Sequence, residues 1–174
     1  MYNSLMSFKY VWKNKEANFG EPIENEIPGG THISVENVLK FNDKYVALRR
    51  PGAVPEHEIS EKAIKTGKPH LYFVHGLPQW GETMGQYVRR VVREQAGVGI
   101  KSFKVVDLHM EVYEDSNQWA WTPVLIVEID QLPVPGIYGN EVIEVVVFDK
   151  DNIPDEFGWW EKEELEKFLT KHSV

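Results

Sequence analysis

Hydrophobic residues recur at helical spacing in the middle of the chain. They stand at positions i, i+3, i+4, i+7 and i+8, which places them on one stripe of an amphipathic helix. Thr83 is a suitable N-cap with Gln86 three residues later, and Gly97 suits the positive φ that often ends a helix. The pattern therefore predicts a helix from Met84 to Ala96. Its apolar stripe comprises Met84, Tyr87, Val88, Val91 and Val92.

Shorter runs of apolar and β-branched residues predict strands on both sides of this helix. Residues 33–41 and 44–51 are two such runs, and Asn42-Asp43 between them is typical of a tight turn. Residues 71–74 form a short apolar run before the central helix. The last pattern, over residues 160–171, returns to helical spacing, with an acidic start and a lysine near its end. The other predicted strands are residues 103–113, 123–129 and 142–148.

The loop and helix in the middle of the chain carry a spaced motif. Gly76 is followed by five residues and Glu82, and after seven more residues Arg90 begins the run Arg-Val-Val-Arg-Glu-Gln-Ala-Gly-Val. This segment, Gly76 to Val98, resembles the box of the Nudix hydrolase family. That box reads Gly, five residues, Glu, seven residues, then Arg-Glu-apolar-x-Glu-Glu-x-Gly-apolar. The order of strands and helices around the segment is similar to the family as well.

The resemblance implies an α/β (α+β) fold, a Nudix-like α/β/α sandwich with a mixed β-sheet. We expect this domain over residues 31–174, after an N-terminal extension of residues 1–30. The extension has three interpretations: peripheral decoration, an extra edge strand, or a contact in a homodimer. An insertion, residues 52–70, includes a predicted short helix from Glu56 to Thr66. It is either peripheral or a roof over the ligand cleft, since loops on a rigid scaffold carry specificity.

The resemblance also implies a divalent cation site, because glutamates on the family's box helix hold Mg²⁺ or Mn²⁺ against a substrate diphosphate. Here two of those positions hold Val91 and Gln95. Glu94 and, in the preceding loop, Glu82 remain as metal ligands and catalytic carboxylates. Each lost carboxylate removes a Coulomb attraction to the dication of ~8 kcal/mol at a separation of ~4 Å and a dielectric constant of ~20. We therefore expect weak cation binding, which bound phosphates would strengthen.

Each of these residues also has an interpretation that involves no chemistry. Glu94 can pair with Arg90 one helical turn away, and Val91 can simply extend the apolar stripe. His75 stands where the family usually has a glycine, and it can be a loop histidine with a local hydrogen bond. In the catalytic interpretation, His75 acts as a general base in a site short of carboxylates, while Arg90 orients the nearby carboxylates.

Arginines and one tryptophan near the box are candidates for substrate binding. Arg49 and Arg50 end a strand that in the family borders the cleft, and Arg90 lies on the box helix. The planar fork of arginine suits a diphosphate even without a metal ion. Trp80, in the loop before the helix, is placed to stack a nucleobase, although large aromatic residues more often bury area in a core or an interface.

Further candidates lie later in the chain. A carboxylate from a late loop often assists catalysis in this family, and Glu141 and Glu144 both fit by position. Trp119 and Trp121, near the entrance of a predicted strand, are weaker candidates than Trp80 for stacking a base. The sequence does not choose between the two glutamates.

Composition narrows the class of protein. The chain has 174 residues, 42% of them hydrophobic, which suffices for one buried core. It has no cysteine, which excludes disulfides, thiolate metal sites and cysteine nucleophiles. No apolar run approaches the ~20 residues of a membrane span, and the start lacks a signal-peptide core, so we expect a cytoplasmic protein without a membrane partner. A net charge of −8 argues against non-specific nucleic-acid binding.

Three functions are consistent with these observations. The first is a Nudix pyrophosphohydrolase that needs Mg²⁺ or Mn²⁺ and acts on nucleoside diphosphate-linked compounds through a degenerate metal site. The second is a catalytically inactive Nudix-fold module that binds a nucleotide-like small molecule. The third is a protein-interaction domain. The two missing carboxylates favour the second and third functions, whereas the family resemblance favours the first.

Overall fold

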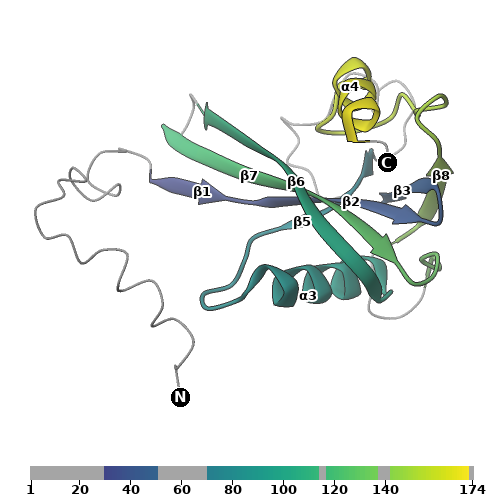
Figure 1. Cartoon of the computed structure of the whole chain (residues 1–174), viewed down its shortest axis with the longest axis horizontal. Helices are drawn as coiled ribbons and strands as arrows, with labels where there is room; N and C mark the ends of the chain where they lie inside the picture. Colours follow the sequence, from purple (N-terminus) through teal and green to yellow (C-terminus); the bar gives the residue numbers. More distant parts are fainter. Residues whose placement is uncertain (1–29, 51–69, 114–116, 137–141, 173–174) are drawn as a thin grey trace, which may run out of the picture.

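The computed structural model describes residues 30–50, 70–113, 117–136 and 142–172. One mixed eight-stranded sheet lies between two helices, α3 below it and α4 above it in Figure 1. The strands are β1 (Thr31–Ile33), β2 (Val35–Phe41), β3 (Lys44–Arg49), β4 (Leu71–Tyr72), β5 (Val74–Gly76), β6 (Ile100–Tyr113), β7 (Gln118–Ile129) and β8 (Glu144–Phe148), and the helices are α3 (Met84–Ala96) and α4 (Lys162–His172).

Strand β2 is an inner strand with partners on both edges. On one edge it pairs in parallel with β7, from Glu36 opposite Val124 to Lys40 opposite Glu128. On the other edge its first half pairs antiparallel with β5 and its second half with β3. Because both faces of the sheet are also covered, β2 is buried from Val35 to Leu39. A polar side chain within this stretch is therefore held away from bulk solvent.

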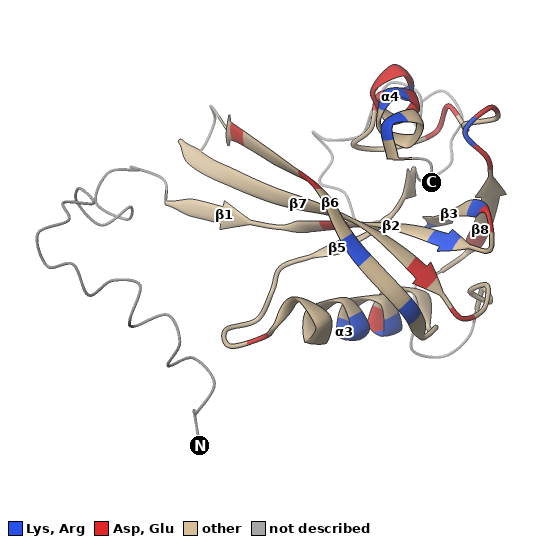
Figure 2. Cartoon of the chain, in the orientation of Figure 1, with Lys and Arg blue, Asp and Glu red and all other residues tan. Residues whose placement is uncertain are grey.

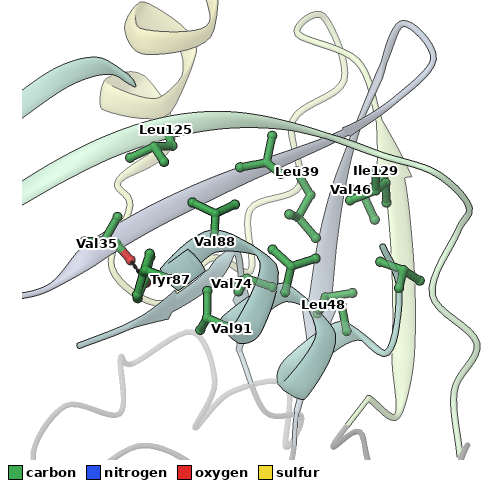
Figure 3. Packing of buried hydrophobic residues seen from close by; sticks show 14 of the residues in the cluster. Val35, Leu39, Val46, Leu48, Val74, Tyr87, Val88, Val91, Leu125 and Ile129 are labelled. Atoms are coloured by element: carbon green, nitrogen blue, oxygen red, sulfur yellow. Dashed lines mark hydrogen bonds between the residues drawn. The ribbon is translucent and has the colours of Figure 1, made fainter. Parts of the chain in front are cut away.

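Two hydrophobic cores fill the space between the sheet and the helices. The core on the α3 side includes Val35, Leu39, Val88 and Val91, which Figure 3 shows packed together. The core on the α4 side is built around Val38 and aromatic residues of the strands and of α4. Residues that alternate along β2 thus serve opposite cores, as the period of two in a strand requires.

Helix α3 begins and ends where its sequence predicts. Thr83 caps the first turn. Its side chain accepts a hydrogen bond from the backbone N–H of Gln86, and the Gln86 side chain accepts one from the backbone N–H of Thr83. Gly97 ends the helix with φ of 72°, and its N–H donates to the Arg93 carbonyl. These reciprocal bonds occupy backbone groups that a helix end leaves without intrahelical partners.

The other predicted elements are confirmed where the structure describes them, with two differences. The strand predicted over residues 33–41 is interrupted at Ser34, because Ile33 ends β1 and β2 begins at Val35. The predicted strand over residues 71–74 is two short strands, β4 and β5, which pair with different neighbours, β3 and β2. Phe73 lies between them and packs in the α4-side core. The extension, the insertion up to residue 69, the helix predicted from Glu56 to Thr66, and Glu141 lie outside the described residues. In the part of the chain that the structure does describe, no helix has the length and apolar content of a membrane span.

Candidate ligand site

Strand β5 separates two groups of polar residues. Its Val74 and Gly76 lie toward α3, whereas His75, between them, lies on the α4 side opposite Glu36 of β2. Facing residues in an antiparallel pair project to the same side of a sheet. Strand β5 thus lies with its backbone next to α3, the helix of the box, and with the titratable side chain of His75 on the opposite face of the sheet.

A buried hydrogen-bonded group holds β5 against β2 and α3. The Tyr87 hydroxyl lies 3.0 Å from the Val35 carbonyl and 3.1 Å from the Gly76 carbonyl. The Asn37 amide donates to the Val74 carbonyl at 2.9 Å and contacts the same hydroxyl at 3.1 Å. Burial raises the pKa of Tyr87, so it remains a neutral phenol. These contacts fix the position of the loop that starts at Gly76.

On the α3 side, Arg90 binds both remaining box carboxylates. Its Nε and Nη2 donate to the two oxygens of Glu82 at 2.6 and 2.7 Å, and its Nη1 donates to Glu94 at 3.1 Å. The backbone N–H of Gln79 donates a further hydrogen bond to Glu82 at 2.8 Å. The hydrogen bonds from Arg90 and Gln79 lower the pKa of Glu82 to about 2, so this carboxylate stays ionised. We call Glu82, Arg90 and Glu94 the Arg90 network.

The two box positions that lack a carboxylate have structural roles. Val91 is 2% exposed and belongs to the α3-side core. The Gln95 side chain bonds to both backbone groups of His75: its amide nitrogen donates to the carbonyl, and its oxygen accepts from the N–H at 3.3 Å. A glutamate at position 95 would lose the first of these bonds, because a carboxylate has no donor. Gln95 therefore joins the last turn of α3 to β5.

These residues do not fit a divalent cation that binds without help from a ligand. The negative charge of Glu82 is balanced by its ion pair with Arg90. Val91 has no lone pair, and the Gln95 side-chain oxygen already accepts a hydrogen bond from the His75 N–H. Glu94, with a side chain 58% exposed against 13% for Glu82, is the more open of the two box carboxylates. The described residues contain no group of three or more acidic or histidine side chains with the geometry of a metal site.

On the α4 side, Glu36 and His75 lie under two tryptophans. The Trp160 indole donates to the Glu36 carboxylate at 3.1 Å. The His75 ring meets the Trp159 ring edge-on, with 4.0 Å between centroids, and Tyr72 lies 4.8 Å from the same indole. Trp159 is exposed on its outer side. We call Glu36, Arg50, Tyr72, His75, Trp159 and Trp160 the α4-side cluster.

The segment before α4 is attached to the sheet, and this attachment places both tryptophans. The Leu71 N–H donates to the Glu156 carbonyl at 2.8 Å, and the Gly158 N–H donates to the Leu71 carbonyl at 3.0 Å. A Cβ atom at Gly158 would overlap the Tyr72 ring, so only glycine lets the chain pass this close. Trp159 follows directly and covers Tyr72 and His75.

The titratable groups of the α4-side cluster are tuned by burial. Desolvation raises the pKa of Glu36 to about 7, although the Trp160 hydrogen bond and the charge of Arg50 oppose this shift. Desolvation, helped by the charge of Arg50, lowers the pKa of His75 to about 4. His75 is therefore neutral at pH 7, while Glu36 is divided between its two protonation states. A group that changes protonation near pH 7 can exchange a proton with a bound ligand.

The predicted site residues lie in three places: the Arg90 network, the α4-side cluster, and a set of ion pairs around Arg49. Arg49 does not face the box helix; it forms ion pairs with Glu144, at 2.7 Å, and with Glu156. Glu144, the first residue of β8, is thus paired with Arg49. Glu141, the other late carboxylate, lies outside the described residues. Arg50 is buried and lies close enough to Glu36 to lower its pKa.

The three tryptophans singled out in the sequence lie in different surroundings. Trp80 is fully exposed in the loop before α3. Trp119 and Trp121 lie 4.8 Å apart on β7, next to β1, so each is the other's aromatic partner. Trp159 was missed by the sequence analysis, as was Glu36. The signal for Glu36 was a lone carboxylate inside an apolar run that forms an inner strand.

Comparison with solved structures identifies the fold. A Nudix hydrolase from Nitrosomonas europaea aligns over 81% of this chain and 86% of its own, with a TM-score of 0.55 and 13% identity. A MutT Nudix hydrolase from Burkholderia pseudomallei aligns over 78% and 96%, with a TM-score of 0.55 and 13% identity. A Bacillus subtilis pyrophosphohydrolase aligns over 88% and 85%, with a TM-score of 0.55 and 16% identity. No family model and no curated protein matches the sequence. The structural matches confirm the predicted sandwich.

Proposed function

We propose that this chain, which has the Nudix fold, binds a nucleoside diphosphate-linked compound and does not hydrolyse it through a metal ion on the box helix. The observation that carries the proposal is that the residues at positions 91 and 95 have structural roles in the fold. Val91 is part of the core, and Gln95 is bonded to the backbone of β5. Both positions contribute to the stability of the fold, and neither offers a charge to a cation.

The features that favour a ligand lie around β5. Arg50 supplies a positive charge next to Glu36 and His75, and a guanidinium suits phosphate oxygens. Trp159 and Trp80 each present an indole to solvent, and an exposed indole can stack on a nucleobase. We infer that the ligand contacts the α4-side cluster, with its diphosphate near Arg50 and a base on the Trp159 indole.

A second candidate function is hydrolysis by a reduced metal site. Two observations favour it. Glu94 is exposed and has Arg90 as its one ion-pair partner among the described residues, and the solved structures reported above are described as hydrolases. A cation carried in by the substrate's phosphates would need few protein carboxylates, since Mg²⁺ often keeps several waters and substrate oxygens.

One experiment separates the two functions. Product release is measured for nucleoside diphosphate sugars, dinucleoside polyphosphates and nucleoside triphosphates with Mg²⁺ or Mn²⁺, and binding of the same compounds is measured by calorimetry in EDTA. The variants are Glu94→Gln, Arg50→Gln and Trp159→Ala, with Arg93→Gln, an exposed arginine of α3, as the matched control for charge removal.

We expect no turnover and a compound that binds in EDTA. Glu94→Gln and Arg93→Gln should leave its affinity unchanged, while Arg50→Gln and Trp159→Ala should each weaken it about tenfold or more, the effect of losing ~1.4 kcal/mol. Turnover that Glu94→Gln abolishes would establish the hydrolase instead. A folded protein that neither turns over nor binds any of these compounds would refute both functions.

A further inference from the structure

The second half of β6 extends beyond both helices. Figure 1 shows the ends of β1, β6 and β7 projecting past α3 and α4 on one side of the molecule. There β7 pairs with β1 from Trp119 to Trp121 and with β6 from Gln118 onward. All six residues of β6 from Leu108 to Tyr113 are exposed. A strand packed on one face would instead alternate buried and exposed residues, so neither face of this part of β6 is buried by the described residues. Its side chains make ring contacts there, of His109 with Trp160 and of Tyr113 with His32.

The two halves of β6 differ in how their outer edge is protected. In the first half, register shifts interrupt the pairing with β7 at Ile100/Ser102 and at Val105/Asp107, and Lys101 and Lys104 add charge. Bulges and lysines are the usual means by which proteins prevent edge strands from pairing with other chains. From Leu108 to Val112 the pairing is regular, and the outer edge has no partner among the described strands. This half has neither a register shift nor a lysine.

The sequence of this half is complementary to itself. In an antiparallel pair of two copies centred on Met110, Leu108 of each copy faces Val112 of the other, and the two Met110 residues face each other. His109 of each copy then faces Glu111 of the other, which joins a potential cation to an anion. Apolar pairs and opposite charges at facing positions stabilise sheets, each by about 0.2–1 kcal/mol. A two-fold axis through Met110 satisfies all of these pairs at once, as an isologous interface requires.

We propose that a second copy of this chain binds here, with the β6 strands paired antiparallel about Met110 so that the two sheets become continuous. The apolar face of the pair would contain Leu108, Met110 and Val112 of both copies, side by side. Ile33 and Trp121 lie on the neighbouring strands and widen this surface. The proposal concerns β6 alone and does not depend on the proposed ligand.

The absence of cysteine from the chain makes this register directly testable. In the proposed dimer, facing Cα atoms lie about 4.5–5.5 Å apart, within the range that a disulfide spans. Met110→Cys should therefore form a covalent dimer under mild oxidation. Val105→Cys is the matched control: it is on the same strand and 50% exposed, against 55% for Met110, but it would lie about 30 Å from its copy. Leu108→Cys should crosslink with Val112→Cys in a mixture faster than either does alone.

Sedimentation provides a test without any crosslink. We expect a dimer for the unmodified chain and a monomer for Met110→Lys, since two lysines would face each other on the axis. Glu111→Lys should weaken the dimer at least tenfold, and His109→Glu added to Glu111→Lys should restore it, because the facing charges are then opposite again. A monomer at all concentrations would overturn the proposal. A dimer that persists in Met110→Lys would also overturn it. So would a dimer that the β6 substitutions leave intact and that is lost only when residues 1–29 are removed.

Discussion

The two faces of β5 each hold a carboxylate near an arginine, and the pKa values of these carboxylates shift in opposite directions. Glu82, toward α3, receives two direct hydrogen bonds from Arg90, and its pKa falls to about 2. Glu36, toward α4, receives one hydrogen bond from a neutral indole, and burial raises its pKa to about 7. A nearby arginine is therefore not sufficient to keep a carboxyl group ionised. Direct contact and access to water decide its charge.

The comparison has a functional consequence. The motif that points to chemistry in the sequence lies on the α3 side, where Arg90 holds Glu82 as a fixed anion. The groups with titrations suited to proton exchange lie on the α4 side, where the sequence shows no motif. Figure 2 shows basic and acidic residues on both α3 and α4, so the two sides differ in the environment of their carboxylates and not in the sign of their surface charges. We therefore place the ligand on the α4 side.

The largest effect should come from restoring a carboxylate at position 91. Val91→Glu would bury a charge in the α3-side core and should lower the free energy of unfolding by about 3–5 kcal/mol, the cost of an uncompensated buried charge. Chemical denaturation measures this loss, with Val91→Thr as a control of similar size. If Gln95→Glu is added, millimolar Mg²⁺ should recover part of the loss, because a ligand that binds only the folded state stabilises it. A loss below about 1 kcal/mol would show that position 91 reaches water.

The next effect concerns pH and the α4 side. The pKa of Glu36 is raised from 4.5 to about 7, so its contribution to stability is present at low pH and is lost as pH rises through this range. The pKa of His75 is lowered from 6.5 to about 4, so its contribution is present above pH 6.5 and is lost as pH falls. Each contribution is on the order of 3 kcal/mol, and the two have opposite slopes between pH 4.5 and 6.5.

Single substitutions should separate these opposing slopes. Urea unfolding of the unmodified chain should give a nearly constant stability between pH 4.5 and 6.5. Glu36→Gln should leave a stability that rises with pH, and His75→Asn should leave one that falls. Two variants that both keep the constant profile would show that neither group is perturbed as the structure indicates.

A smaller effect should follow from removing the link between α3 and β5. Gln95→Ala deletes two hydrogen bonds to the His75 backbone and should cost about 1–2 kcal/mol. Gln79→Ala is a matched control, because the exposed Gln79 side chain has no hydrogen bond among those described. Amide exchange at His75, followed by NMR, should accelerate in the first variant and not in the second. Equal stabilities of the two variants would contradict the structural role of Gln95.

The smallest effect on stability should come from the Arg90 network. Arg90→Gln should raise the pKa of Glu82 toward its ordinary range, as read from a carboxyl carbon titration by NMR, while unfolding changes little because solvent-accessible ion pairs contribute little. Arg89→Gln, one residue earlier, should leave that pKa unchanged, since Arg89 donates to the Gly85 carbonyl instead. An unchanged Glu82 titration in Arg90→Gln would assign the shift to the Gln79 amide.

Local signals were sufficient to predict most of the fold. The apolar stripe and the cap at Thr83 give the bounds of α3, and Asn42-Asp43 gives the hairpin of β2 and β3. The split between β4 and β5 could not be predicted from a four-residue run. It depends on which strands lie beside the two pieces, and these neighbours are distant in sequence.

The candidate site was harder to predict, for a similar reason. The spacing of the box identified Glu82, Arg90 and Glu94, which lie within one loop and one helix. Glu36 and Trp159 become neighbours of His75 only after β2, β5 and the segment before α4 have assembled. Their pKa values and contacts come from burial, which the spacing of residues along the chain does not reveal.

The pairing of β2 with β7 also bears on the order in which the chain folds. Ser34, directly before β2, and Thr122 of β7, whose hydroxyls lie 3.1 Å apart, are 88 residues apart in the sequence. The hairpin of β2 and β3 can form from neighbouring residues, whereas the parallel edge of β2 must wait for β7 to be synthesised. Contacts of such long range slow folding, because the intervening chain loses its freedom before they form. We therefore expect the arrival of β7 to limit the rate at which the sheet is completed.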